Sequence, residues 1–303
     1  MTAHQLGSTL RVFRPAPHVL AFYDGRIAGV RAWSEQPNWL DDGAFALGAC
    51  SYAVVDGADA LVYDAHISPR HADLIRRTLE REGVRTMRLV LSHWHVDHVA
   101  GNAVFADCEI IANAATADLI DENRTALETG TPPIDPLIGP TSTFEHRLDL
   151  MVGSLAVELH RFDVHSRDGT VLVLPEAGML LAGDTLEDPI TYVAEAERLE
   201  EHLLDLARLE LMPFSRILPN HGAPEVIQAG GYGRDLLAAT RRYVEALLRC
   251  CRDPALAAQD LRTFLAGDLQ AGRVHYFEPY ERVHRNNVAH VLARARDCQP
   301  KGA

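Results

Sequence analysis

Three histidines and an aspartate stand within six residues of this chain, in the segment His93-Trp94-His95-Val96-Asp97-His98. The segment follows an apolar run, 88–92, which is typical of a buried strand that ends in a loop. Because side chains alternate along an extended segment, we expect His93 and His95 to point the same way. Imidazole nitrogens and carboxylate oxygens are the ligands that zinc-like divalent ions prefer. The segment therefore predicts a metal-binding loop at the end of a strand.

Three later segments place the same residue types at the ends of further strand-like runs. In chain order they are His165 after the run 155–162, Asp184 after the run 179–183, and His221 after the run 216–219. Together with the first loop, these blocks resemble the metal-binding pattern of the metallo-β-lactamase superfamily, over about residues 45–225. One departure is that His165 stands in a Val-His-Ser turn, where members of the family carry a Gly-His-Thr-like turn.

The resemblance implies two divalent metal ions and a ligand set for each. The first ion would be held by His93, His95 and His165, the second by Asp97, His98 and His221, with Asp184 and a hydroxide bridging the two. Carboxylates near the pair reduce the repulsion between two close cations. Zinc is the expected metal, with manganese or iron as alternatives, because all three accept these ligand types. Asp64, at the end of the run 60–64, is implied to form a hydrogen bond behind the metal loop.

By the same resemblance, the chain is expected to be a dinuclear metal-dependent hydrolase. The bridging hydroxide would attack the acyl carbonyl of an ester, lactone or thioester of a small molecule. The expected catalytic residues are Asp97, as proton carrier, Asp184, and Tyr192, as a hydrogen-bond donor to the substrate carbonyl. Three alternatives stay open: an iron-loaded oxidoreductase on the same fold, β-lactamase-type amide hydrolysis, and a binding protein with a vestigial site.

The order of strand-like and helical segments resembles an α+β fold, the four-layer αβ/βα sandwich of that family, with a C-terminal helical appendage. We expect residues 1–230 to form the catalytic domain and 231–303 a helical extension packed on its core. Helical spacing of apolar residues marks the tail segments 236–248, 261–265 and 287–296. The aromatic segment 274–280 is expected to pack rather than to bind substrate.

Local signals predict several elements. Asp24-Gly25 predicts a tight hairpin between the run 19–23 and Ile27. Ser68-Pro69 predicts the start of a helix that ends near Gly83. The proline-rich loop 129–136 is equally consistent with a cover over the site and with a plain surface connection.

Other polar residues receive ordinary roles. His160 lies within a predicted strand and is expected to be structural, and His66 is expected to be a loop histidine rather than part of the site's mouth. Cys50 is expected to be a small buried apolar side chain. His284 and Arg285 in the tail are weaker candidates for contacting an acidic group of a substrate.

Composition limits the partners. The net charge of −13 argues against a general nucleic-acid binder, which needs basic patches, so a small-molecule substrate is expected. No apolar run approaches a membrane span, and residues 1–7 lack an export signal, so we expect a cytoplasmic protein with no membrane partner. The five cysteines, an odd number, predict no disulfide framework. A homodimer formed through the tail stays an open alternative.

Overall fold

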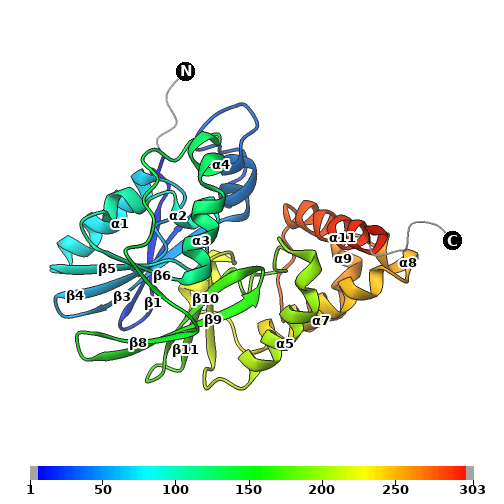
Figure 1. The fold of residues 1–303 in the computed structure, drawn as a ribbon. Coiled ribbons are helices and arrows are strands. Elements are labelled where there is room, and N and C mark those ends of the chain that lie inside the picture. The colour runs from blue at the N-terminus through cyan, green and yellow to red at the C-terminus, as the bar shows by residue number, and fades with distance from the viewer. Residues whose placement is uncertain (1–5, 298–303) are drawn as a thin grey trace.

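Two β-sheets packed face to face form the centre of the protein in the computed structural model, which describes residues 6–297 (Figure 1). The seven-stranded sheet runs in chain order: β1 (Arg11–Ala16), β2 (Val19–Asp24), β3 (Ala49–Asp56), β4 (Asp59–Tyr63), β5 (Thr86–Val90), β6 (Glu109–Asn113) and β7 (Ser142–Phe144). The second sheet has the order β12 (Arg216–Pro219), β11 (Met179–Gly183), β10 (Ser166–Leu174), β9 (Leu155–Val164) and β8 (Arg147–Val152).

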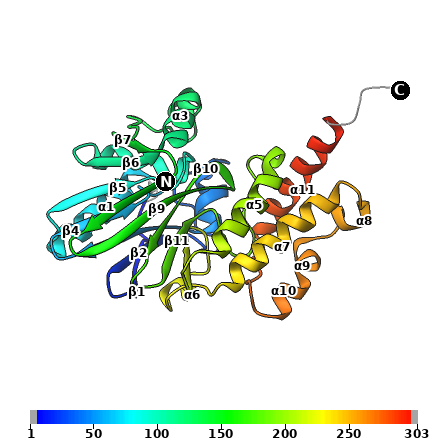
Figure 2. The same ribbon diagram turned by 60° about the horizontal axis from the view of Figure 1, so that its bottom comes forward.

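Helices cover the outer sides of both sheets. On the seven-stranded sheet lie α1 (Pro69–Arg81), α2 (Val96–Val99), α3 (Ala114–Glu122) and α4 (Arg124–Thr129). On the five-stranded sheet lies α5 (Leu199–Glu210), and the short α6 (Pro224–Gln228) contacts β1 and β2. Beyond α5 in Figure 2 lie α7 (Asp235–Cys250), α8 (Pro254–Ala257), α9 (Leu261–Phe264), α10 (Ala266–Gln270) and α11 (Tyr280–Asp297). This arrangement confirms the predicted four-layer α+β sandwich.

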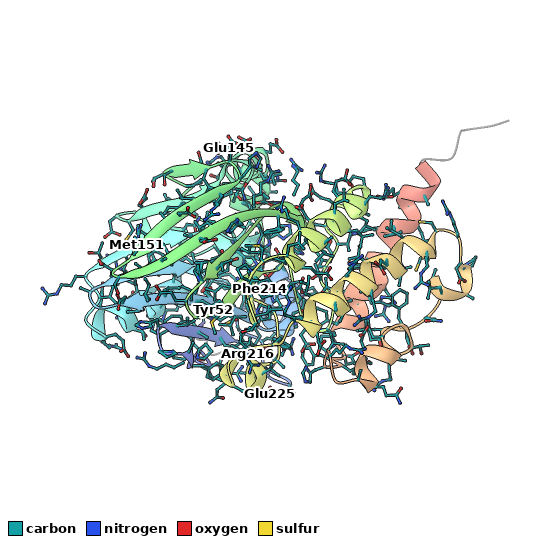
Figure 3. The ribbon with its side chains drawn as sticks, turned by 90° about the horizontal axis from the view of Figure 1, so that it is seen from below. Tyr52, Glu145, Met151, Phe214, Arg216 and Glu225 are labelled. Atoms are coloured by element: carbon teal, nitrogen blue, oxygen red, sulfur yellow. The ribbon has the colours of Figure 1, made fainter. Side chains whose placement is uncertain are left out.

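Strand alternation divides the buried side chains between two cores. In β2, Ala21 and Tyr23 join the core between the sheets, whereas Leu20 and Phe22 join the core beneath α1 and α3. The core between the sheets continues without a break into α5, α7 and α11. In Figure 3, the buried Tyr52 lies in the interior, and its hydroxyl donates to the Pro219 carbonyl at 2.5 Å, which joins β3 to the end of β12.

The C-terminal helices pack on the rest of the protein, with the buried Tyr243 and Tyr280 in the continuous core. The predicted segments correspond to α7, to α9 with α10, and to α11, which begins seven residues before the predicted start at residue 287. The aromatic segment 274–280 packs as expected, because Val274 and Tyr280 are buried. A domain boundary at residue 230 stays a prediction. The last residues of the predicted extension, 298–303, lie outside the part of the chain that the structure describes.

The helix predicted from Ser68-Pro69 is confirmed. The Ser68 side chain accepts a hydrogen bond from the His71 backbone N–H, and α1 ends before Gly83, whose φ of 95° suits glycine.

The hairpin predicted at Asp24-Gly25 is wrong. β2 pairs with β1 and β3 instead, and Ile27 lies in no strand. The Asp24 carboxylate accepts hydrogen bonds from the Gly25 N–H and the Thr9 hydroxyl, at 2.8 and 2.7 Å, and contacts His71. These contacts turn the chain out of the sheet into a connection, 25–48, that includes the single-turn helix Leu40–Phe45.

Candidate metal centre

The fold brings the predicted ligands together at one edge of the sandwich. His93 follows β5, Asp184 follows β11 and His221 follows β12, so each stands at the carboxyl end of a strand that has a parallel neighbour. Asp97 and His98 lie in the short helix α2, directly after the first loop.

His165 stands between β9 and β10, where the register of the two strands shifts. Its φ is 70°, and Asp64, on the opposite sheet, has the same φ. The left-handed region costs a non-glycine residue about 1–2 kcal/mol. Two such residues at one site show that the surrounding contacts impose this geometry on the backbone.

Three imidazoles converge on one point. His95 Nδ1 lies 2.9 Å from His93 Nε2 and 2.9 Å from His165 Nε2, and the last two nitrogens are 3.2 Å apart. Burial lowers the pKa of all three rings, to about 3 for His95 and about 4 for His165. The rings are therefore neutral near pH 7 and present lone pairs, the form in which histidine binds a metal.

A second cluster lies beside the first. His221 Nε2 is 3.2 Å from Asp97 Oδ2, and His98 Nε2 is 3.6 Å from Asp97 Oδ1. Burial opposes charging of both rings, but the Asp184 carboxylate and Asp97 together raise the pKa values of His98 and His221. Negative charge at this cluster therefore favours a cation, either a proton or a metal ion.

Asp184 joins the two clusters. Its Oδ2 atom lies between 3.2 and 3.6 Å from one Nε2 atom of each of four rings, those of His93, His98, His165 and His221. Burial alone would raise the pKa of this carboxyl, but the nearby His221 and His98 hold it well below its usual range. A carboxylate at the centre of four imidazoles is in the position to bridge two cations.

Hydrogen bonds within the two clusters leave some buried polar atoms without a partner, as expected of atoms that bind a metal ion. Within the described residues, the buried atoms His98 Nε2 and Asp184 Oδ1 have no hydrogen-bond partner. A buried polar atom without a partner costs about 1–3 kcal/mol, so such atoms are rare in native interiors. Both atoms lie within the cluster, where a cation would satisfy them.

Hydrogen bonds on the far side of the rings fix their orientation. His93 Nδ1 contacts Ser92 Oγ at 2.9 Å, and His98 Nδ1 contacts Asp64 Oδ2 at 2.9 Å. The other two contacts go to backbone carbonyls, from His165 Nδ1 to Tyr192 at 2.9 Å and from His221 Nδ1 to Gly48 at 2.6 Å. The predicted role of Asp64 behind the metal loop thus has a direct contact, and these partners leave the Nε2 atoms free to bind metal.

Asp168, which the sequence analysis did not single out, links the two metal-binding loops. It is fully buried and accepts from the Trp94 N–H at 2.9 Å and from the Ser166 hydroxyl at 2.6 Å. Burial raises its pKa to about 6. The sequence feature that could have pointed to Asp168 is its position three residues after His165.

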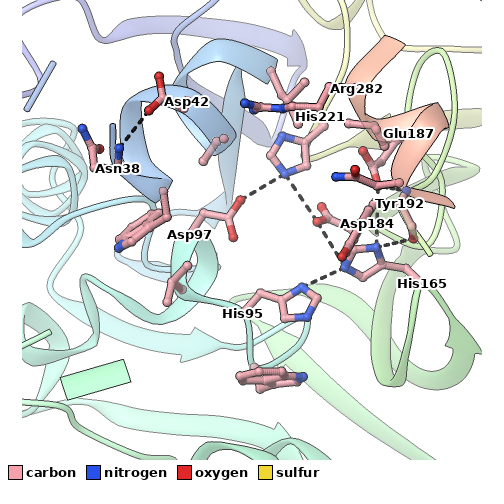
Figure 4. A pocket seen from close by; sticks show the side chains of 18 residues that line it. Asn38, Asp42, His95, Asp97, His165, Asp184, Glu187, Tyr192, His221 and Arg282 are labelled. Carbon is pink, nitrogen blue, oxygen red and sulfur yellow. Dashed lines mark hydrogen bonds and ion pairs between the residues drawn. The ribbon is translucent and has the colours of Figure 1, made fainter. Parts of the chain in front are cut away.

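A cavity of about 550 Å³ opens in front of the clusters (Figure 4). Its apolar lining comes from Trp39, Ala44 and Leu47 of the connection 25–48 and from Trp94 and Val96 of the metal loop. Polar lining comes from Asn38 and Asp42 of the connection 25–48, from Glu187 and Tyr192 of the loop after Asp184, and from Arg282 and Asn286 of α11. The cavity therefore combines the candidate metal ligands with a largely apolar surface.

Glu187 is the functional candidate that sequence reasoning missed. Its buried carboxylate accepts from the Tyr192 N–H at 2.9 Å and from the Tyr280 hydroxyl at 2.8 Å, and lies 3.7 Å from His165 Nδ1. Burial and the nearby Asp184 raise its pKa to about 8. A single glutamate three residues after Asp184 belongs to no pattern, so only the fold reveals it.

The other polar candidates lie away from the cavity. His160 contacts Glu158 on β9 at 2.8 Å, and the buried His66 contacts the Phe22 carbonyl at 3.1 Å. Cys50 is buried as expected, and burial raises the pKa of its thiol to about 12.

The two tail residues considered for an acidic substrate group do not line the cavity. His284 is wrong for this role because α11 turns it inward against Tyr243. Arg285 borders an adjoining hollow, which shares Asp42 and Arg282 with the cavity. Arg282 lines the cavity instead.

The loop 129–136 supports the cavity from behind rather than covering it. The Pro132 carbonyl accepts a hydrogen bond from the Trp39 indole at 3.1 Å, and Ile134 is buried in the core beneath the seven-stranded sheet.

Among the helices of residues 6–297, none is long and apolar enough to cross a membrane.

Comparisons with known proteins agree with this geometry. The sequence profile of the metallo-beta-lactamase superfamily matches residues 46–247. The atrochrysone carboxyl ACP thioesterase AgnL7 of Paecilomyces divaricatus is 27% identical over 208 residues, which are 68% of this chain and 60% of the thioesterase. The chain thus spans about 60% of the length of this curated relative.

Solved structures show the same fold at low identity. A metallo-beta-lactamase from Pontibacter korlensis superposes with a TM-score of 0.60 at 16% identity, over 78% of this chain and 99% of that one. The metallo-beta-lactamase FIM-1 from Pseudomonas aeruginosa, in its mono-zinc form, gives 0.59 at 16% identity, over 81% and 98%.

Proposed function

This chain belongs to the metallo-beta-lactamase superfamily of hydrolases, and from that premise we propose that it is a dinuclear zinc enzyme that cleaves small-molecule acyl thioesters, with esters and lactones as related substrates. The observation that carries the proposal is the place of Asp184 Oδ2, within 3.6 Å of four imidazole nitrogens from two clusters.

The ligand assignment follows the two clusters. His93, His95 and His165 would hold one ion, Asp97, His98 and His221 the other, and Asp184 would contact both. Divalent metals bound there would supply a Lewis acid for the acyl carbonyl and lower the pKa of a bound water to about 7. The apolar lining surrounds the ligands with side chains of low polarity, which strengthens electrostatic interactions near them.

The chain's own side chains would handle protons and orientation. Asp97 lines the cavity and is held against His221, so it is placed to pass a proton to the departing thiol or alcohol. The preference for thioesters comes from the thioesterase relative, and the apolar lining from Trp39, Leu47 and Trp94 suits an apolar acyl group.

A metal-dependent substrate panel tests the proposal. We expect the protein purified without added metal to contain about two zinc ions per chain by elemental analysis. We expect it to hydrolyse octanoyl thioesters, to lose activity after treatment with a chelator, and to regain it with zinc. A protein that retains iron and consumes oxygen would favour the oxidoreductase alternative, and cleavage of β-lactams alone would favour amide hydrolysis.

The Tyr192→Phe variant tests the second proposed catalytic role. Tyr192 lines the cavity, and its ring centroid lies 5.9 Å from that of His165. If the hydroxyl donates to the substrate carbonyl, we expect kcat to fall by about 10-fold, the net contribution of one ordinary hydrogen bond, with unchanged metal content. An unchanged kcat would remove Tyr192 from the mechanism, because the variant keeps the Tyr192 carbonyl that orients His165.

A further inference from the structure

The helix α11 forms part of the cavity wall although it lies beyond the residues that match the superfamily profile, 46–247. Hydrogen bonds fix it to the loop that follows Asp184. The Tyr280 hydroxyl donates to Glu187 Oε2 at 2.8 Å, and Asn287 accepts from the Val193 N–H at 2.9 Å and donates to the Thr191 carbonyl at 3.0 Å. The helix is therefore held in a set position relative to the candidate metal centre.

Two exposed side chains of α11, Arg282 and Asn286, reach the cavity. Arg282 makes no hydrogen bond or ion pair with any residue between 6 and 297 that the structure describes. Asp42 also lines the cavity and attracts Arg282 electrostatically, but its two carboxylate oxygens already accept hydrogen bonds from Arg31, at 2.6 and 3.2 Å. The Arg282 guanidinium is thus a positive charge at the cavity with its donors available.

From this arrangement we propose that Arg282 binds an anionic group of the substrate, a carboxylate or a phosphate, and that α11 is the element that selects substrates. The inference rests on the proposed thioesterase function of the same site. A guanidinium offers paired donors that match both anions. The substrate class is therefore an acyl thioester with an apolar acyl part, facing Trp39 and Trp94, and a negative charge away from the reacting carbonyl.

Three thioesters of equal acyl length separate the possible sources of the charge. Octanoyl-N-acetylcysteamine has no anion, octanoyl-coenzyme A carries phosphates on the thiol side, and the suberic acid monothioester of N-acetylcysteamine carries a carboxylate on the acyl side. We expect Arg282→Gln to lower kcat/KM by about 10-fold or more for one of the two anionic substrates and to leave the neutral substrate within about twofold.

Arg285→Gln is the matched control, because it removes the same charge from the same helix at a residue that lines only the hollow beside Arg282 and not the main cavity. We expect this variant to keep the wild-type kcat/KM for all three substrates. Equal effects of Arg282→Gln on all three thioesters, no effect on any, or equal effects of both variants would overturn the role of Arg282.

A binding measurement separates this inference from the proposed function. Calorimetric titration with coenzyme A and with suberate needs no turnover, and Arg282→Gln should weaken binding of one of them by about 10-fold. If the wild type binds neither anion more tightly than the variant does, the inference fails. If the wild type cleaves no thioester but shows this Arg282-dependent binding, the proposed function fails while the anion site stands.

Discussion

Asp184→Asn is expected to lose metal at both positions of the centre and to lower hydrolysis by about 1,000-fold, or ~4 kcal/mol of transition-state stabilisation. Asparagine has nearly the same shape, so the change removes charge rather than packing. The Oδ2 atom of Asp184 faces four imidazole nitrogens within 3.6 Å, and a neutral amide cannot offset two cations there. Elemental analysis and turnover of an octanoyl thioester measure the two effects.

His160→Ala is the control for this experiment. His160 is a histidine on β9, near His165 in the chain, but its ring contacts Glu158 rather than the metal cluster. We expect this variant to keep its metal and its activity within about twofold, as is usual for partly exposed residues outside a site. An Asp184→Asn protein that retained both ions and full turnover would contradict the bridging role.

The candidate metal ligands were readable from the sequence because each block is local. A strand ending in a loop places His93 and His95 at a sheet edge whatever the rest of the chain does, and the same holds for Asp184 and His221. The pattern that marks each block spans only a few residues, because alternation along a strand already sets the direction and spacing of the ligand side chains that follow it. The structure then brings the blocks together as the family resemblance implied.

The cavity wall was not readable because it depends on long-range packing. Trp39 lies in the connection 25–48, which begins where the sequence favoured a hairpin at Asp24-Gly25. There the Asp24 carboxylate contacts Thr9 and His71. Such contacts join residues whose proximity no local pattern encodes.

The tail illustrates the same limit through helix phase. Because α11 begins at Tyr280 and not at residue 287, the predicted helix left the inward face of residues 280–286 undefined. With Tyr280 and His284 turned into the core, Arg282 falls on the side that reaches the cavity. The position of each residue around the helix axis thus decides that Arg282, and not His284 or Arg285, lines the cavity.

Asp64→Asn is expected to weaken metal binding by about 10–100-fold while the protein stays folded, because partners that orient a ligand contribute about that much to metal affinity. Asp64 is fully buried, and its two carboxylate oxygens have different hydrogen-bond partners. Oδ1 accepts from the Ser92 N–H at 2.6 Å, and Oδ2 contacts His98 Nδ1 at 2.9 Å and accepts from the Asn220 side chain. An asparagine supplies only one acceptor, so either the loop or the ring loses its partner.

The backbone favours this substitution as a clean test. Asp64 has a φ of 70°, a conformation that asparagine tolerates better than most residues, so the change adds little strain. Asp59→Asn, at the other end of β4, is the matched control. Competition with a chromophoric chelator measures the affinity of each variant, and thermal unfolding of the metal-free proteins reports their stability. His98 Nδ1 also lies 3.2 Å from the Asn220 side-chain nitrogen and 3.4 Å from Ser92 Oγ. Wild-type affinity in Asp64→Asn would show that these two contacts suffice to orient His98, whereas a loss confined to this variant ties the metal loop to the carboxylate behind it.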